Sequence, residues 1–317
     1  MSAVDVSVVI PTFNRETRLA FALEALAEQT LDRERFEVIV VRAPGGAEGL
    51  LTEAPPDLPV TFLRSDVAGP AAQRNVGWRA AKGRVVAFTD DDCRPAADWL
   101  ERFVAADAGA SVILQGQTVA DPEEKHLLLG FSRTMEIDRF DPWAPTCNIA
   151  YPRALLERVD GFDETFLDAW GEDTDLALRA IAAGAEQHFV EDAIVRHAVL
   201  PRRLGQALGD AVRRSDIHVV VARHPQQRRA LDMGLFTKRR HAWVLLGFAG
   251  LGFARRHPLL AIAAWVPWLR TYKPGRGVSA GQLVWWLVVV MPRRLLLDST
   301  HVGAMAVSSA RHRTPVI

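Results

Sequence analysis

VAFTDDDCRP, residues 86–95, is an apolar run that ends directly in three carboxylates, Asp90, Asp91 and Asp92. Adjacent like charges repel one another unless a cation lies among them. Carboxylate oxygens suit Mg²⁺ and Mn²⁺, so we expect these aspartates to hold a hard divalent cation. The alternative is a solvated turn or helix start, where aspartate is also favoured. Because the aspartates follow the apolar run without a turn glycine, the sequence favours the metal site.

The segments around this run predict a parallel sheet. VSVVIP (6–11), FEVIVV (36–41), PVTFL (59–63) and RVVAFT (84–89) are short and rich in β-branched or aromatic residues, as are strands buried on both faces. Apolar residues at helical spacing connect the first two strands, and AAQRNVGWRAAKG (71–83) predicts a helix between the last two. Strand–helix–strand order builds parallel units whose ligands bind at the carboxyl ends of the strands. We therefore expect an α/β, Rossmann-like domain with a mixed, mainly parallel sheet.

The composition narrows the class of protein. With 49% hydrophobic residues among 317, the chain can bury a full core. Lys and Arg together number 38, as do Asp and Glu, so the net charge is zero and no global field attracts nucleic acid. The two cysteines are too few for a disulfide framework, which indicates a reducing, cytoplasmic compartment. The N-terminus, MSAVDVSVVIPTFNR, predicts a first strand and not a signal peptide.

Four segments in order carry a family resemblance: VVIPTFNR (8–15), QRNVGWRAAKGRVVAFTDDD (73–92), GFDETF (161–166) and GEDTDLALR (171–179). Together they resemble the successive motifs of the family 2 glycosyltransferases, which share a nucleotide-sugar-binding fold called the glycosyltransferase A fold. The resemblance covers about residues 5–200. It implies a catalytic domain, which we place at residues 1–227, that transfers a sugar from a nucleoside-diphosphate sugar to the hydroxyl of a saccharide or lipid-linked acceptor.

The resemblance also implies roles for individual residues. Asp90 and Asp92 form an Asp-x-Asp element that binds Mn²⁺ or Mg²⁺ at the donor diphosphate, and Asp90 also faces the ribose. His197 completes the metal site through an imidazole nitrogen, although a lone histidine is more often structural. The other residues implied to bind the nucleotide-sugar are Pro11, Thr12, Phe13, Asn14, Arg74, Asn75, Asp91, Asn148 and Trp170.

Glu172 and Asp173 are the candidate catalytic pair. The resemblance places one of these carboxylates where it takes the proton from the acceptor hydroxyl. We choose Asp173 as the general base, because a neighbouring carboxylate such as Glu172 raises a pKa. The alternative is that acidic residues in a first helical turn only complement the helix dipole. Trp170 has two interpretations as well, a stacking wall for a sugar ring or a core tryptophan.

One part of the family pattern is missing. Arg42 and Ala43 stand where similar proteins usually have an acidic pair that reads the nucleotide base, so uracil recognition is in doubt. Transfer with inversion is the leading interpretation. Two others stay open: a retaining enzyme of the same fold, and a catalytically silent nucleotide-sugar-binding or scaffold protein.

The C-terminal region, residues 228–317, has a different composition. Its apolar segments, 241–269 and 281–297, break into pieces of about 12 to 15 residues, which are shorter than the roughly 20 that cross a bilayer. They are rich in tryptophan and bordered by arginine and lysine, which predicts helices lying peripherally on an anionic membrane surface, at the inner face of the plasma membrane. The alternatives are a helical cap on the catalytic domain or a dimer interface.

Overall fold

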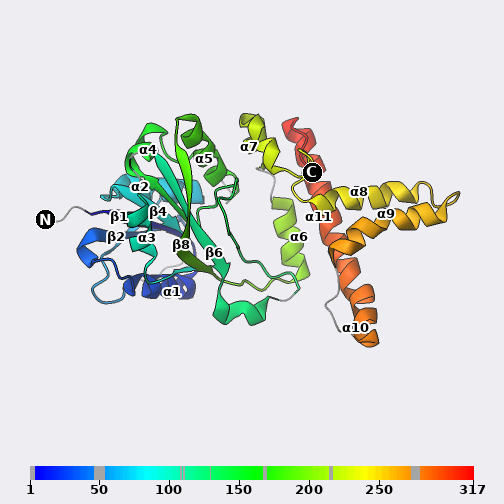
Figure 1. Ribbon diagram of the computed structural model, residues 1–317, viewed down its shortest axis with the longest axis horizontal. Coiled ribbons are helices and arrows are strands. Elements are labelled where there is room, and N and C mark those ends of the chain that lie inside the picture. Colours follow the sequence, from blue (N-terminus) through cyan, green and yellow to red (C-terminus); the bar gives the residue numbers. More distant parts are fainter. Residues whose placement is uncertain are drawn as a thin grey trace. The chain divides into compact units, whose positions relative to one another are not determined.

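The computed structural model describes residues 4–45, 54–107, 109, 111–128, 130–166, 170–213, 217–272 and 279–317. It divides the chain into two compact units, Met1–Pro201 and Arg202–Ile317 (Figure 1). This boundary precedes residue 227 because the helices α6 (Leu204–Arg213) and α7 (Ile217–Arg223) pack against the last helix of the chain. The assignment of catalysis to residues 1–227 and of membrane association to 228–317 stays a prediction.

The first unit is built on one eight-stranded sheet in the order β3-β2-β1-β4-β7-β6-β8-β5. β1, β2, β3 and β4 are parallel, β6 and β8 are parallel, and β7 and β5 join their neighbours antiparallel. The sheet is therefore mixed and mainly parallel, as predicted. The strands are β1 (Val6–Thr12), β2 (Phe36–Arg42), β3 (Val60–Arg64), β4 (Val85–Thr89), β5 (Cys93–Pro95), β6 (Val112–Ala120), β7 (Asn148–Pro152) and β8 (Glu186–His197).

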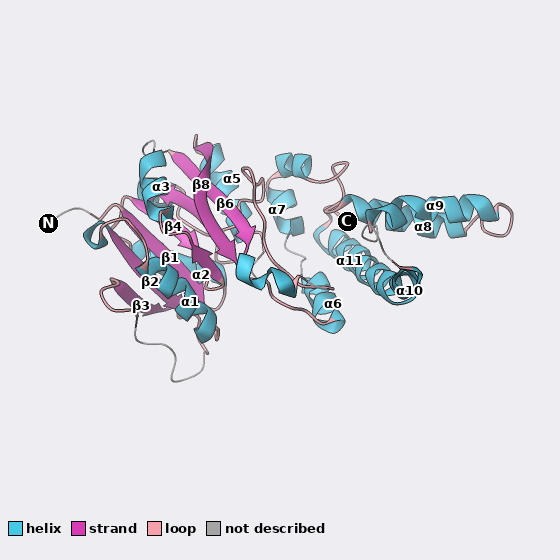
Figure 2. Cartoon of the chain, turned by 60° about the horizontal axis from the view of Figure 1, so that its bottom comes forward, coloured by secondary structure: helices cyan, strands magenta, loops and turns pink. Residues whose placement is uncertain are grey.

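Helices cover both faces of this sheet (Figure 2). Alternate residues of β1 point to opposite faces: Val8 and Ile10 pack with α1 and α3, whereas Val9 packs with α2, α4 and α5. This period of two, with apolar residues at every position of β1 except Ser7 and Thr12, is the pattern that predicts a strand buried on both sides. The helices are α1 (Glu16–Ala27), α2 (Pro70–Ala80), α3 (Trp99–Ala106), α4 (Arg153–Arg158) and α5 (Glu172–Ala182), with 3₁₀ turns at Arg33–Arg35 and Pro122–Leu127.

A glycine lets α2 approach the sheet closely. A Cβ atom at Gly77 would lie 2.4 Å from a methyl carbon of Val9 on β1, so a side chain there would force its buried neighbours to shift. The tight contact brings the N-terminal half of α2, which carries Arg74, to the carboxyl edge of the sheet. The short helix–sheet distance is thus part of how the site is positioned.

The second unit is helical. α8 (Arg239–Leu251) and α9 (Pro258–Thr271) pack along each other and, with α11 (Met291–His312), bury Val244, Trp268, Met291 and Val302. The remaining elements are a 3₁₀ turn at Pro225–Ala230, α10 (Ala280–Trp285) and a π-helical turn at Trp286–Val290.

The expectation that every apolar piece is too short to cross a bilayer is wrong for the last helix. α10, the π-helical turn and α11 form one continuous helix, Ala280–His312, of 33 residues. Pro292 does not end this helix. The π-helical turn just before the proline is wider than an α-helical turn, so it makes room for the ring and tolerates the loss of the hydrogen bond that proline cannot donate. At about 1.5 Å per residue the helix exceeds the roughly 30 Å hydrocarbon core. By length and composition this helix can span a membrane, although one such helix alone is weak evidence for a membrane span. Among the described residues no other helix meets the same criteria.

Candidate active site

The three aspartates lie at the carboxyl end of β4, and two arginines of the chain lie among them. Arg15 Nη1 lies 3.1 Å from Asp91 Oδ1 and 2.9 Å from Asp92 Oδ2. Arg74 Nη2 lies 2.9 Å from Asp90 Oδ1. Because β1 and β4 are adjacent and parallel, Arg15, which follows β1, reaches the same edge of the sheet. Part of the positive charge that the carboxylates require therefore comes from the protein itself.

Asp91 holds two strand ends together. The hydroxyl of Thr12, the last residue of β1, donates to Asp91 Oδ2 over 2.8 Å, and only 4% of Asp91 is exposed. Burial raises the pKa of Asp91 to about 7, while the Arg15 guanidinium and the Thr12 hydroxyl oppose the shift. Both oxygens of Asp91 accept hydrogen bonds from protein groups. Its predicted contact with the nucleotide-sugar, like that of Thr12, stays a prediction.

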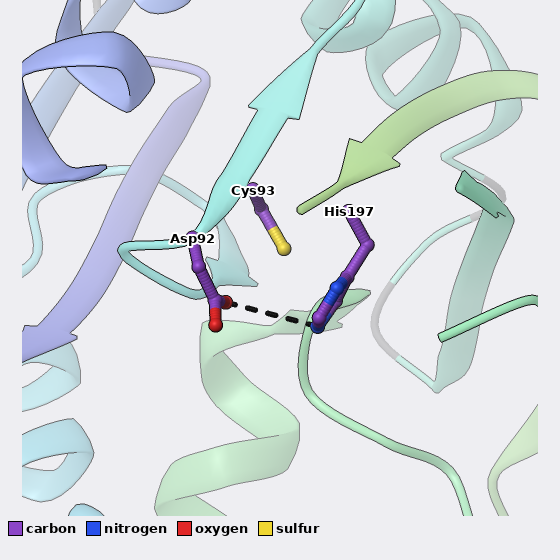
Figure 3. Close-up of side chains that lie close together, drawn as sticks. All are labelled: Asp92, Cys93 and His197. Atoms are coloured by element: carbon purple, nitrogen blue, oxygen red, sulfur yellow. Dashed lines mark ion pairs between the residues drawn. The ribbon is translucent and has the colours of Figure 1, made fainter. Parts of the chain in front are cut away.

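Asp92 and His197 form a pair suited to a metal ion. His197 Nε2 lies 3.7 Å from Asp92 Oδ1, and the potential ligand atoms of Asp92, Cys93 and His197 all lie within 4.8 Å of one another. Figure 3 shows the three side chains pointing toward a common space. They meet because Cys93 of β5 pairs with His197 of β8. The Nδ1–H of His197 donates to the Ala198 carbonyl at 2.8 Å, which leaves the lone pair of Nε2 on the side of Asp92.

These donors fit a divalent cation such as Mn²⁺. Carboxylate oxygens suit Mg²⁺ and Mn²⁺, and an imidazole nitrogen moves the preference toward the transition metals. Burial raises the pKa of the Cys93 thiol well above its usual value, so the sulfur stays protonated and is a poor ligand. Asp90 is bonded to Arg74 and does not belong to this group. Its predicted role as a second metal ligand stays a prediction.

A buried network joins Asp90 to the first turn of α5. Arg74, which is 4% exposed, bonds Glu172 Oε1 through Nη1 at 2.9 Å, and Glu172 is 2% exposed. Asp173 follows at a half-buried position, and Gly171, with φ of 101°, allows the chain to turn into the helix. Burial raises the pKa of both acids, the charge of Asp173 adds to the rise at Glu172, and Arg74 opposes the rise at both. The arrangement supplies a carboxylate that is more basic than usual beside the carboxyl edge of the sheet.

Two asparagines predicted to bind the donor are occupied by the protein. Asn75 Nδ2 donates to the Phe162 carbonyl at 2.8 Å, and its Oδ1 accepts from the Phe162 amide and from Trp78 Nε1. Asn148 is fully buried, accepts from Trp99 Nε1 and donates to two carbonyl oxygens. These bonds fix the turn before α5 and the middle of the sheet. The contacts of both residues with a donor stay predictions.

The remaining predicted residues border the edge. Pro11 is buried in β1, whereas Phe13 is 52% exposed and Asn14 adopts a left-handed conformation with φ of 54°. Arg133 places its guanidinium carbon 5.7 Å from the ring centroid of the half-buried Trp170, so this ring already stacks on a cation. The contacts of all four predicted residues with a nucleotide-sugar stay predictions.

Arg42, at the end of β2, shows what replaces the acidic pair of similar proteins. It forms an ion pair with Glu16 in the first turn of α1, with Nη1 to Oε1 at 3.0 Å. The carboxylate that neutralises it thus comes from a different element. Residues 46–53, which come after this strand end, lie outside the described residues.

Arg15 is the site residue that sequence reasoning did not single out. Its partners are 76 and 77 positions away, so no local pattern links them. The available signal was topological: Arg15 follows the first predicted strand, and the carboxyl ends of neighbouring parallel strands meet at one edge.

The fold and the site define a nucleotide-sugar glycosyltransferase of the glycosyltransferase A fold, and the comparisons with known proteins agree. The family model described as glycosyl transferase family 2 matches residues 7–166, so the chain belongs to that family. The match ends before α5 and β8. The positions of Glu172, Asp173 and His197 in the site therefore come from the structure.

Similar proteins fall in the same class. The glycosyltransferase AglE of Haloferax volcanii is 27% identical over 258 residues, 77% of this chain and 81% of that protein. Validoxylamine A glucosyltransferase of Streptomyces hygroscopicus subsp. limoneus is 29% identical over 217 residues, 56% of this chain and 48% of that protein. The solved mannosyltransferase PcManGT of Pyrobaculum calidifontis, in complex with GDP-Man and Mn²⁺, matches with a TM-score of 0.58 at 19% identity, over 99% of this chain and 88% of that one. Residues 1–349 of S. aureus TarS, in complex with UDP-GlcNAc, match with a TM-score of 0.54 at 16% identity, over 98% and 93%.

Proposed function

We propose that the protein is a metal-dependent, inverting glycosyltransferase that moves a sugar from a nucleoside-diphosphate sugar to an acceptor hydroxyl, with Asp173 as general base. One observation carries the proposal: Arg74 bonds Asp90 at the end of β4 and Glu172 at the start of α5, both at 2.9 Å. The buried guanidinium thus links the carboxyl end of β4 to the first turn of α5 and holds the two at a fixed separation. Such preorganisation is what a displacement between two substrates requires.

Asp92 and His197 are the residues that would hold the cation. When bound there, Mn²⁺ or Mg²⁺ neutralises the charge that develops on the departing diphosphate. The solved PcManGT, with GDP-Man and Mn²⁺, supports the same donor class for this fold.

The proton and the bonds balance in one displacement. The Asp173 carboxylate takes the proton of the acceptor hydroxyl, the acceptor oxygen forms a bond to the anomeric carbon, and the bond from that carbon to the diphosphate oxygen breaks. A raised pKa makes Asp173 a stronger base than an exposed aspartate. No covalent intermediate forms on the protein, and the anomeric configuration inverts.

The test is Asp173→Asn in the full-length protein. We expect donor affinity with Mn²⁺ to stay within about threefold of wild type, and the transfer rate to fall by about 10²- to 10⁴-fold, the usual contribution of a general base. Asp175→Asn is the matched control, because it removes a negative charge from the same helical turn at a residue that bonds Arg179. An equal loss in both variants, or a loss of donor binding in Asp173→Asn, contradicts the assignment.

Two further measurements separate the alternatives. The anomeric configuration of the product, read by NMR, distinguishes inversion from retention. Hydrolysis of the donor without acceptor, compared with Mn²⁺ and with a chelator, distinguishes an enzyme from a silent binding protein. A product of retained configuration, or a donor that binds and is never cleaved, rules out the inverting mechanism.

We propose, secondly, that the helical unit associates with the cytoplasmic leaflet of the plasma membrane and brings the site to a lipid-linked or membrane-proximal acceptor. Supporting this, its helices expose many large apolar side chains, and Arg255 and Arg256 lie between α8 and α9. Soluble surfaces rarely expose so many, and basic residues among them favour anionic lipid. The exposed apolar residues include Leu246, Phe248, Leu251, Phe253, Leu259, Leu260, Ile262, Val266, Val284, Trp285 and Val288.

Flotation with anionic vesicles tests this proposal. Leu259 and Leu260 are 79% and 62% exposed, so Leu259→Glu with Leu260→Glu changes the surface without disturbing the core. We expect the bound fraction of the full-length chain to fall about tenfold in this variant. Val67→Glu, at an exposed apolar residue of the first unit, is the control and should float like wild type. A wild-type chain that stays in the soluble fraction at low salt, monodisperse without detergent, overturns the proposal.

A further inference from the structure

The helical unit contains a buried polar cluster that glycosyl transfer does not use. His241, Asp298 and His301 are 1%, 0% and 8% exposed, in a region otherwise packed with apolar and aromatic side chains. One potential ligand atom from each residue lies within 4.8 Å of the others. Burying three polar groups costs free energy unless they are satisfied. Their convergence at one place therefore calls for a ligand or a complete hydrogen-bond network.

The helices place these side chains on facing surfaces. His241 lies in the first turn of α8, and Asp298 and His301, three residues apart, share one face of α11. The two imidazole rings lie 5.5 Å apart between centroids. Residues at this spacing on a helix are well suited to bind one ion together.

The outer contacts orient the cluster as they do in metal sites. Thr237 Oγ1 lies 3.1 Å from His241 Nδ1, and His241 Nε2 is buried without a hydrogen-bond partner among the described residues. In metal sites, a histidine commonly has one ring nitrogen held by a hydrogen bond while the other binds the ion. Leaving that second nitrogen unsatisfied would otherwise cost stability.

The carboxylate is held in the same manner. Asp298 Oδ2 accepts from Trp268 Nε1 at 2.9 Å and from Tyr272 Oη at 2.8 Å, both on or next to α9. Its Oδ1 accepts from Arg240 Nε at 2.9 Å. Each oxygen of an ionised carboxylate has two lone pairs, so Oδ1 keeps one for a further partner. Arg240 is the competing cation at this oxygen.

We infer that His241, Asp298 and His301 form a second metal site, which binds a divalent transition-metal ion of the Zn²⁺ type and joins α8 to α11. Two imidazole nitrogens and one carboxylate oxygen are a ligand set that Zn²⁺ accepts, whereas Mg²⁺ prefers oxygen ligands alone. The site lies within the helical unit and does not depend on the proposed transfer reaction.

The experiment uses the full-length Asp92→Asn protein, so that the predicted catalytic metal site is silenced. Calorimetric titration with Zn²⁺, and the visible absorption of added Co²⁺, should show one ion bound per chain. His241→Phe and His301→Gln should each weaken binding at least 30-fold. Arg240→Gln should strengthen it about tenfold, since a competing positive charge leaves Asp298. His218→Gln, at a buried histidine of the same unit that bonds Ser309 and Val316, should leave Zn²⁺ affinity unchanged.

The result that overturns the inference does not depend on the folding of any ligand variant. The titration extends to about 100 μM metal, a concentration that would still reveal a weak structural site. If the Asp92→Asn protein binds no Zn²⁺ or Co²⁺ under these conditions, the cluster is an Arg240–Asp298 ion pair packed beside two histidines. An unchanged stoichiometry and affinity in folded His241→Phe, confirmed by circular dichroism, overturns it equally. Weaker Zn²⁺ binding in Arg240→Gln would show that Arg240 supports the site and does not compete for it, contrary to the geometry argued above.

Discussion

Arg74→Met tests whether one buried guanidinium neutralises the acidic turn of α5. Arg74 has two partners. The side chain of Glu172 is 2% exposed, with Oε1 2.9 Å from Arg74 Nη1, whereas the side chain of Asp90 is 29% exposed and still reaches water. Removing one member of a buried ion pair typically costs about 3–5 kcal/mol, because the other charge is left in a poorly polarisable environment. Methionine keeps most of the apolar stem of arginine, so the cost of a cavity is small. Because Glu172, whose pKa is already raised, can take up a proton instead of staying charged, we expect the loss to lie at or below the lower end of that range, about 1–3 kcal/mol at pH 8.

The pH dependence of this loss has a definite sign. Burial and Asp173 already raise the pKa of Glu172, and removal of Arg74 raises it further. A carboxyl whose pKa is higher in the folded state binds its proton more tightly there, so its contribution to stability is present at low pH and is lost as the pH rises through the folded pKa. The difference in unfolding free energy between wild type and Arg74→Met should therefore be smaller at pH 5 than at pH 8.

The second arm of the experiment removes the uncompensated charge. In Arg74→Met with Glu172→Gln, we expect recovery of about 1–3 kcal/mol relative to Arg74→Met alone, the range of coupling for groups in direct contact. The measurement is urea-induced unfolding of the full-length chain, followed by circular dichroism. Arg139→Met is the control, because Arg139 pairs with Asp138 at the surface and should change stability by less than about 1 kcal/mol. A loss below 1 kcal/mol in Arg74→Met at pH 8, or no recovery in the double variant, would refute the reasoning.

Three other outcomes are expected from the site. Asp92→Asn should abolish turnover with Mn²⁺ while the circular dichroism spectrum stays that of wild type; near-normal activity would exclude Asp92 as a ligand. kcat/KM should rise with pH through the raised pKa of Asp173, because only the carboxylate accepts a proton, and a flat profile from pH 5 to 8 would exclude it as the base. Asn75→Ala should cost about 2–4 kcal/mol in urea unfolding, since it strands the buried N–H groups of Phe162 and Trp78; a loss below 0.5 kcal/mol would contradict the bonding.

The elements that sequence predicted best are those whose signal is local. β1, β2 and β4 are nearly continuous apolar runs buried on both faces, interrupted by Ser7 in β1 and Glu37 in β2, and a polar residue ends each of them. Since a parallel strand delivers the residues after its carboxyl end to the ligand-binding edge, the strand assignment alone predicted the positions of Asp90 and Asp92. The pairing of His197 with Asp92 was also anticipated, but only through family resemblance, because their approach depends on the antiparallel pairing of β5 with β8.

The parts that sequence could not show depend on partners distant in the chain. Whether Asn75 faces a ligand or the backbone of Phe162 is decided by a turn 87 residues away. The long helix Ala280–His312 was hidden for a different reason: a proline normally interrupts a helix, and the π-helical turn that accommodates Pro292 has no distinctive composition.

The carboxylate oxygens of Asp92 have different partners. Arg15 occupies Oδ2 of Asp92, while His197 faces Oδ1, so the side available to a metal ion is not the side taken by the guanidinium. Arg15 nevertheless lowers the negative potential that a divalent ion would meet at Asp92. Asp90 pairs with Arg74, and Asp91 shares Arg15 with Asp92, so the three aspartates and the two arginines together carry one formal negative charge. A divalent ion bound at Asp92 would reverse that sign, and a donor diphosphate would then supply the balancing negative charge. We therefore expect the arginines that stabilise the clustered carboxylates to favour binding of metal and nucleotide-sugar together over binding of metal alone.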